Sequence, residues 1–186
     1  MAISSNRRFL PAFVALLVLI ALMMVATVAS AQQKFPISTT GEGVNSRYVQ
    51  QHVIDVGDVA GHQVRILEVH RVHTKKQIVL DGVRVVEEWD RGFSDYTNGV
   101  GPAHGYGIWV LEDGNKVFLE WHGTSYSTTT ATGSKRGTFN GTTKIAGGTG
   151  RFAKIRGVMS DSVEFDTDPQ SGYSRAANKG EYWFEN

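Results

Sequence analysis

Glu120 and His122 are the side chains best placed to do chemistry, because they lie two residues apart in an alternating segment. Residues i and i+2 of a β-strand share a face, so the carboxyl and the imidazole lie side by side if this segment is a strand. In an apolar cavity the loss of water raises the pKa of a carboxyl group, and such a pair could move protons. We therefore predict Glu120 and His122 as catalytic residues.

The groups opposite this pair depend on the turn at Asp113-Gly114, which joins residues 104–111 to residues 116–122. A two-residue turn places glycines opposite the pair and opens space beside it, whereas a three-residue turn shifts the register by one and places Tyr106 opposite Glu120. The first alternative opens that space between Trp109 and Phe118, and the second gathers His104 and Tyr106 with the pair, so we predict these four residues as ligand-binding. The competing interpretation is a polar outer face, since half of each barrel strand faces outward.

Other clusters favour structural roles. His70 and His73 are three apart, which puts them on opposite faces of a strand, and with His62 they complete no recognised ligand spacing, so we predict no metal site. The acidic segment Val83–Thr97 is typical of a solvated strand face. No Gly-x-Ser-x-Gly motif is present, and we expect no cofactor.

Composition excludes several classes of site. The 186 residues contain 19 Lys+Arg, 18 Asp+Glu and no cysteine, for a formal charge of +1. Disulfides, thiolate metal centres and cysteine nucleophiles are therefore excluded, and the charge balance gives no basis for nucleic-acid binding. The length fits a single domain.

The first 31 residues have the pattern of a secretory signal peptide. Arg7 and Arg8 precede the apolar run Phe9–Val28, and Ala29-Ser30-Ala31 forms a small-x-small site for cleavage before Gln32. The run is also long enough to span a bilayer as an uncleaved anchor, in which case the protein would be membrane-attached. In either case we expect residues 32–186 to be extracytoplasmic, periplasmic or secreted.

Residues 32–186 predict an all-β domain. Apolar and β-branched runs alternate with glycine-containing turns, and no three-turn helical pattern appears. Eight strands at this spacing favour a closed barrel over a sandwich, because closure leaves no unpaired edge. The predicted strands are Tyr48–Val56, Gln63–Val72, Val83–Thr97, His104–Leu111, Lys116–Tyr126, Arg136–Ile145, Ile155–Phe165 and Gly180–Phe184.

The segment Phe139–Gly157 contains a Gly147-Gly148-Thr149-Gly150 turn followed by Phe152. It resembles the strand–turn–strand segment of dirigent proteins and of allene oxide cyclase-like barrels. That resemblance implies an eight-stranded antiparallel barrel of the calycin type, often trimeric, with an apolar ligand cavity. Phe152 is expected to close one end of the barrel.

Three functions follow as hypotheses. The first is an exported barrel that binds a small apolar, aromatic or amphipathic molecule. The second, implied by the resemblance, is a cofactor-free isomerase or cyclase in which Glu120 or His122 handles a proton. The third is an oligomeric interaction protein, such as a homotrimer, with a filled barrel. An inward orientation of Glu120 and His122 would favour the second hypothesis.

Overall fold

The structure is a computed structural model that describes residues 32–42, 45–74, 78–129, 133, 135–166 and 174–186. The signal peptide or anchor predicted for residues 1–31 and the turn predicted at residues 168–172 lie outside these ranges. Among the described residues no helix is long and apolar enough to cross a membrane.

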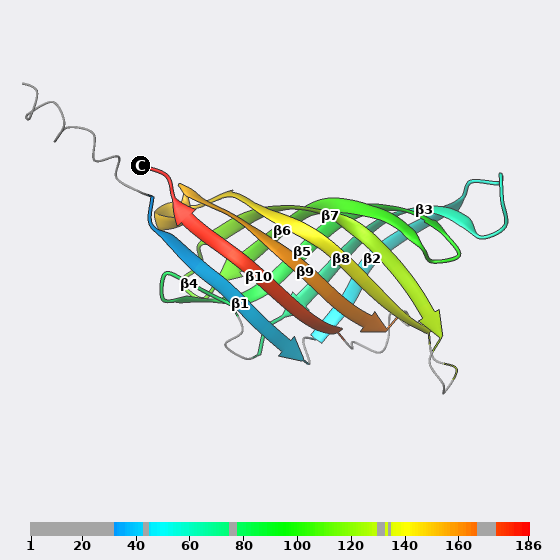
Figure 1. Ribbon diagram of the computed structural model, residues 1–186, viewed down its shortest axis with the longest axis horizontal. Helices are drawn as coiled ribbons and strands as arrows, with labels where there is room; N and C mark the ends of the chain where they lie inside the picture. The colour runs from blue at the N-terminus through cyan, green and yellow to red at the C-terminus, as the bar shows by residue number, and fades with distance from the viewer. Residues whose placement is uncertain (1–31, 43–44, 75–77, 130–132, 134, 167–173) are drawn as a thin grey trace, which may run out of the picture. The chain divides into compact units, whose positions relative to one another are not determined.

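Ten antiparallel strands form the domain, which confirms the all-β prediction but not the strand number (Figure 1). All eight predicted strands are present, and two were missed: the N-terminal β1 and the two-residue β4. The strands are β1 (Lys34–Glu42), β2 (Asn45–Asp55), β3 (His62–Val72), β4 (Val79–Leu80), β5 (Val83–Thr97), β6 (Gly101–Leu111), β7 (Lys116–Thr129), β8 (Lys135–Gly148), β9 (Ile155–Asp166) and β10 (Ser174–Phe184).

The sheet is open, so the prediction of a closed eight-stranded barrel is wrong. The strand order is β1-β10-β9-β8-β7-β6-β5-β3-β2, with β4 paired to β5, and in the described residues β1 and β2 remain the two edges. We expected closure because it removes unpaired edges, but in the open sheet other features hinder the pairing of a further strand with β1 or β2. Pro36 in β1 has no N–H to offer, and a bulge between Tyr48 and Gln50 interrupts β2.

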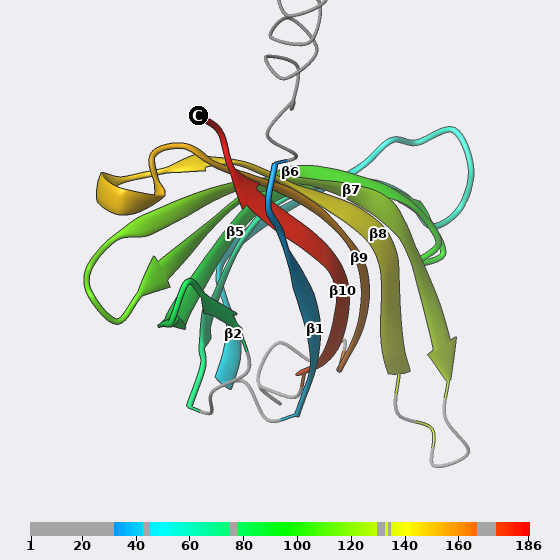
Figure 2. The same cartoon turned by 60° about the vertical axis from the view of Figure 1, so that its left-hand side comes forward.

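One face of the sheet is concave (Figure 2), and glycines on it let a large ring approach the backbone closely. Gly92 of β5 and Gly105 of β6 are direct cross-strand partners beneath the Trp121 ring. A Cβ at Gly92 would lie 2.5 Å from Trp121 Cη2, and one at Gly105 would lie 2.6 Å from Trp121 Cζ2. Larger residues at these two positions would therefore displace the ring.

The hydrophobic core fills the part of the concave face next to β4 and the 3₁₀ turn η1 (Gly150–Phe152). Phe152 is fully buried there, as expected for a residue that closes one end. Thr149 supports the turn, because its carbonyl accepts from the Phe152 N–H at 2.9 Å and its hydroxyl accepts from the Lys116 N–H at 2.9 Å. The core stops partway along the strands, which leaves the rest of the concave face for a cavity.

Candidate functional site

A cavity of about 160 Å³ lies on the concave face beside the core. Leu119, Trp109 and Met159 belong to both the core and the cavity wall, so the core forms the cavity floor. Much of the wall is aliphatic or aromatic, with polar and charged side chains entering from several strands. The remaining wall residues are Ser46, Tyr48, Leu67, Val69, Arg71, His73, Glu88, Asp90, Tyr96, Ala103, Trp121, Ser125, Phe139, Thr143, Asp161, Val163, Phe165, Asp166, Ser174, Ala176 and Asn178.

The β6–β7 hairpin adopts the second of the two predicted registers. Leu111 and Asn115 flank a three-residue turn, and the Leu111 N–H donates to the Asn115 carbonyl at 2.9 Å. Gly114 has φ = +83°, which suits the glycine that ends such a turn. Tyr106 consequently faces Glu120, and His104 faces His122.

This register gathers the predicted polar cluster on the outer face, away from the cavity. The side chain of Glu120 is 49% exposed and pairs with Lys144 at 3.3 Å. Tyr106 is 69% exposed, and His104 and His122 are exposed as well. Alternation puts odd-numbered residues of β6 on the inner side, so the even-numbered ones face outward.

Only one of the six predicted site residues lines the cavity. Trp109 is 1% exposed and forms part of the wall, whereas Phe118 is 39% exposed and does not. The pairing of Glu120 with His122 on one face is correct, but the expectation that this face looks into the cavity is wrong. The chemical roles predicted for the outer residues remain predictions.

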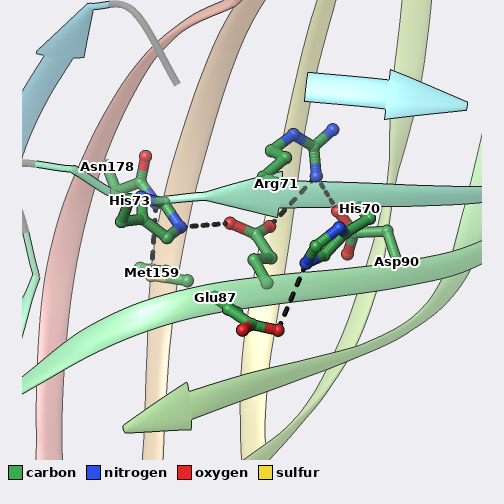
Figure 3. A network of polar contacts seen from close by, with 8 residues as sticks. His70, Arg71, His73, Glu87, Asp90, Met159 and Asn178 are labelled. Atoms are coloured by element: carbon green, nitrogen blue, oxygen red, sulfur yellow. Dashed lines mark hydrogen bonds and ion pairs between the residues drawn. The ribbon is translucent and has the colours of Figure 1, made fainter. Parts of the chain in front are cut away.

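The inner face instead carries a charged network that joins β3 to β5 (Figure 3). Arg71 lies directly opposite Glu88, and its Nη1 is 3.2 Å from Glu88 Oε1. The same Nη1 donates to Asp90 Oδ2. His73 completes the network, with Nε2 3.2 Å from Glu88 Oε2. All four side chains are largely buried and line the cavity.

The pKa values of the two carboxyl groups in this network shift in opposite directions. Burial raises the pKa of Asp90 above its usual range, and the neighbouring negative charge of Glu88 raises it further. Burial alone would also raise the pKa of Glu88, but the charge of Arg71 and the contact with His73 hold it below its usual range. The guanidinium of Arg71 stays charged because the two carboxyl groups outweigh its own desolvation. Burial and the charge of Glu88 thus favour the protonated form of Asp90, although its contact with Arg71 acts in the opposite direction.

A missing side chain makes room for that acid. Gly107 lies opposite Asp90 on β6, and a Cβ at this position would lie 2.9 Å from Asp90 Oδ1 and 3.1 Å from Leu119 Cδ1. The glycine therefore allows the carboxyl group of Asp90 to pack against the backbone of β6.

A second polar group, centred on Asp161 of β9, enters the cavity across the concave face. Asp161 Oδ2 accepts a hydrogen bond from the Thr143 hydroxyl at 2.6 Å, and no described residue donates a hydrogen bond to the buried Oδ1. Burial raises the pKa of Asp161 to about 6, against the opposing effect of the Thr143 hydrogen bond, and the charge of Glu88 adds to the rise. Asn178 of β10 lies directly opposite Asp161, and its Oδ1 is also buried without a partner among the described residues.

Two indole N–H groups add unfulfilled hydrogen-bonding capacity. Trp109 Nε1 and Trp121 Nε1 are buried and have no acceptor in the described part of the chain. Tyr96 and Ser125, by contrast, bond to each other at 2.8 Å. Buried polar atoms are nearly always satisfied in folded proteins, so a group of unpartnered atoms around one cavity indicates a site for a ligand or ordered water.

The histidines do not form a metal centre. His73 faces the cavity, whereas His70 stacks on Trp89 at 4.0 Å and contacts Glu87, and His62 lies between Asp58 and Asp95. Across the residues that the structure describes, no three His, Cys, Asp or Glu side chains gather with suitable geometry for a metal ion.

Sequence reasoning missed the residues that carry the charge of the cavity. The sequence pattern assigns Glu88 and Asp90 to a solvated strand face, and it does not single out Arg71 or Asp161. Both faces of β5 carry charged and aromatic residues, so its alternation gives no contrast. The glycines of β6 were the available signal, because Gly105 and Gly107 share the inner face with Trp109.

No family model matches the chain. No curated protein matches it. Among solved structures, that of the pterocarpan synthase dirigent protein GePTS1 is similar to it, with a TM-score of 0.41 and 11% sequence identity over 83% of this chain and 87% of that chain. The architecture described above rests on the strand pairing of this chain alone.

Proposed function

We propose that the protein is exported and that it binds a small, largely apolar molecule in the cavity of its concave sheet face. The observation that carries this proposal is the cavity of about 160 Å³ with the buried, unpartnered Nε1 atoms of Trp109 and Trp121 at its wall. An apolar cavity of about 150 Å³ is large enough for benzene. Ligand sites typically combine such walls with a few convergent polar groups.

The third hypothesis, an oligomeric protein with a filled interior, expected no such space. The inner face encloses a cavity instead, which favours a binding role over a purely structural one. A homotrimer is compatible with the proposed function, because the cavity lies on the inner face of the sheet and subunits could contact one another through the outer face.

Native mass spectrometry of the mature protein from its own host's extracytoplasmic fraction tests the binding function. We expect a retained small molecule whose mass identifies its chemical class. Ala103→Leu, which fills space in the cavity wall, should abolish retention. Ala177→Leu is the matched control, because Ala177 is exposed and lies outside the cavity wall. Equal retention by both variants would contradict binding in the cavity.

We propose acid catalysis as a second function, a cofactor-free isomerisation or cyclisation of the bound molecule. The specific support is Asp90, which lies beside the Arg71–Glu88 pair in the cavity wall and whose pKa is raised by burial and by the charge of Glu88. Such an acid could donate its proton to one ligand atom, and the resulting carboxylate could then accept a proton from another atom of the same molecule, so that an isomer is released and Asp90 is protonated again. Once the retained molecule is known, Asp90→Asn should abolish its turnover while changing its affinity little. Unchanged turnover would remove Asp90 from any catalytic role.

A further inference from the structure

Carboxyl groups outnumber guanidinium groups in the cavity wall. Its described side chains include one guanidinium, that of Arg71, and four carboxyl groups: Glu88, Asp90, Asp161 and Asp166. The guanidinium of Arg71 is paired with Glu88 and Asp90, whereas the carboxyl group of Asp161 has no cationic partner among the described residues. A bound molecule with a positive charge would therefore find a favourable field, and an anion an unfavourable one.

Asp161 offers a bound cation a specific hydrogen-bond acceptor. The residue is 9% exposed, and its Oδ1 is buried without a partner among the described residues. Its other oxygen is fixed by Thr143, so the carboxyl group is held in place before any ligand arrives. Asn178 Oδ1, on the adjacent strand and directly opposite, adds a second unpartnered acceptor. A ligand group with more than one N–H bond could donate to both of these acceptors.

Aromatic rings complete a suitable lining. Trp121 and Phe139 pack edge to face at 5.6 Å, and both line the cavity with Trp109. Ring faces attract cations, especially where water is excluded, and Trp is the strongest partner. The wall thus combines apolar contact area, π faces and carboxylate oxygen.

Resting on the binding function proposed above, we propose that the ligand is an apolar organic cation whose ammonium group donates to Asp161 Oδ1. The cost of burying the carboxyl group has already been met when the protein folds, so only the ammonium group loses water on binding. A neutral hydroxyl could also donate to Asp161, but it would leave the charge of the Asp161 carboxylate without a cation. The affinity difference between cation and neutral isostere measures this contribution.

Three one-ring probes test the charge preference on the wild-type mature protein. Benzylammonium is the cation, benzyl alcohol its near-isosteric neutral counterpart and benzoate the anion, and calorimetry or ligand-observed NMR gives their dissociation constants. We expect benzylammonium to bind at least about tenfold more tightly than benzyl alcohol, because close, desolvated charge pairs contribute at least that factor. Benzoate should bind most weakly.

Asp161→Asn locates the contact. Its amide keeps an oxygen for the Thr143 hydroxyl but carries no charge, so the preference for benzylammonium should disappear while benzyl alcohol affinity changes less than about twofold. Glu181→Gln is the control, since it removes one negative charge from an exposed ion pair with Lys34 outside the cavity wall. This control should keep the preference.

The outcomes separate the cation proposal from the binding function. If benzyl alcohol or benzoate binds wild-type protein as tightly as benzylammonium does, the cation proposal fails and cavity binding stands. If the preference persists in Asp161→Asn, the assignment to Asp161 is wrong. If none of the three probes binds and no molecule is retained from the host, both the binding function and the cation proposal fail.

Discussion

Replacing Asp161 by asparagine should stabilise the protein at neutral pH, because the buried carboxyl group opposes folding when it is ionised. Its pKa is raised from 3.8 to about 6 by burial. Between these two values the folded protein binds more protons than the unfolded chain, so wild-type stability falls as the pH rises through this window. Above pH 6 the ionised Asp161 therefore lowers the free energy of unfolding by about 3 kcal/mol relative to acid pH, since one pKa unit corresponds to about 1.36 kcal/mol.

Asparagine removes that charge but introduces an amide NH₂ where Asp161 Oδ1 had no partner. An unsatisfied buried donor costs about 1–3 kcal/mol, so the net gain at pH 7 should be about 0–2 kcal/mol. At pH 3.5 the wild-type carboxyl group is neutral, and the same substitution should instead destabilise by about 1–3 kcal/mol. The effect of Asp161→Asn on the free energy of unfolding therefore changes from destabilising in acid to neutral or stabilising at pH 7.

Urea unfolding followed by tryptophan fluorescence, from pH 3.5 to pH 7.5, measures this dependence. Asp113→Asn is the contrasting control, because the Asn115 backbone N–H and side-chain amide lower the pKa of the exposed Asp113. That variant should lose a small stabilisation at neutral pH and approach wild type in acid. A free-energy difference between Asp161→Asn and wild type that stays constant with pH would refute the reasoning.

Three further predictions use the same kind of measurement or a simpler one. Gly105→Ala should lower the free energy of unfolding by about 1–3 kcal/mol in urea, because the new methyl group would overlap the Arg91 carbonyl oxygen and Trp121 Cζ2; wild-type stability would refute this packing. His62 bonds to two carboxylates that raise its pKa, so its contribution is full below pH 6.5 and lost as the pH rises through the folded pKa. His62→Gln should therefore destabilise at pH 5 and have less effect at pH 9, and an effect that grows with pH would contradict the assignment. The intact mass of protein recovered from outside the cytoplasm should correspond to a chain that begins at Gln32, whereas full-length protein in the membrane fraction would indicate an anchor.

Strand positions could be predicted well because they depend on local alternation and on turn residues. The eight predicted segments all form strands, and Val83–Thr97 has the predicted limits. β1 was missed because Pro36 and a polar run conceal its alternation, and β4 has only two residues. Closure could not be derived from these patterns, since β1 and β2 are consecutive in sequence yet form opposite edges of the sheet.

The candidate site shows the same limit more sharply. Period-two alternation correctly placed Glu120 beside His122, and it offered the observed hairpin register as one of two. It could not say which face of the hairpin becomes concave, because that depends on how all the strands curl together. The relationship to allene oxide cyclases and calycins that the segment 139–157 implies stays a prediction.

The sequence by itself determined that this chain forms β-strands, where most of them lie, which side chains share a face and that cysteine chemistry is excluded. Each of these properties follows from residue types and from spacings of a few positions. Only the tertiary structure decided that the sheet stays open, that the face with Trp109 and Trp121 is the inner one, and that Arg71, Glu88 and Asp90 meet beside a cavity that Asp161 also enters. These contacts join strands far apart in sequence, and the desolvation that sets the pKa values of Asp90 and Asp161 exists only once those strands have come together.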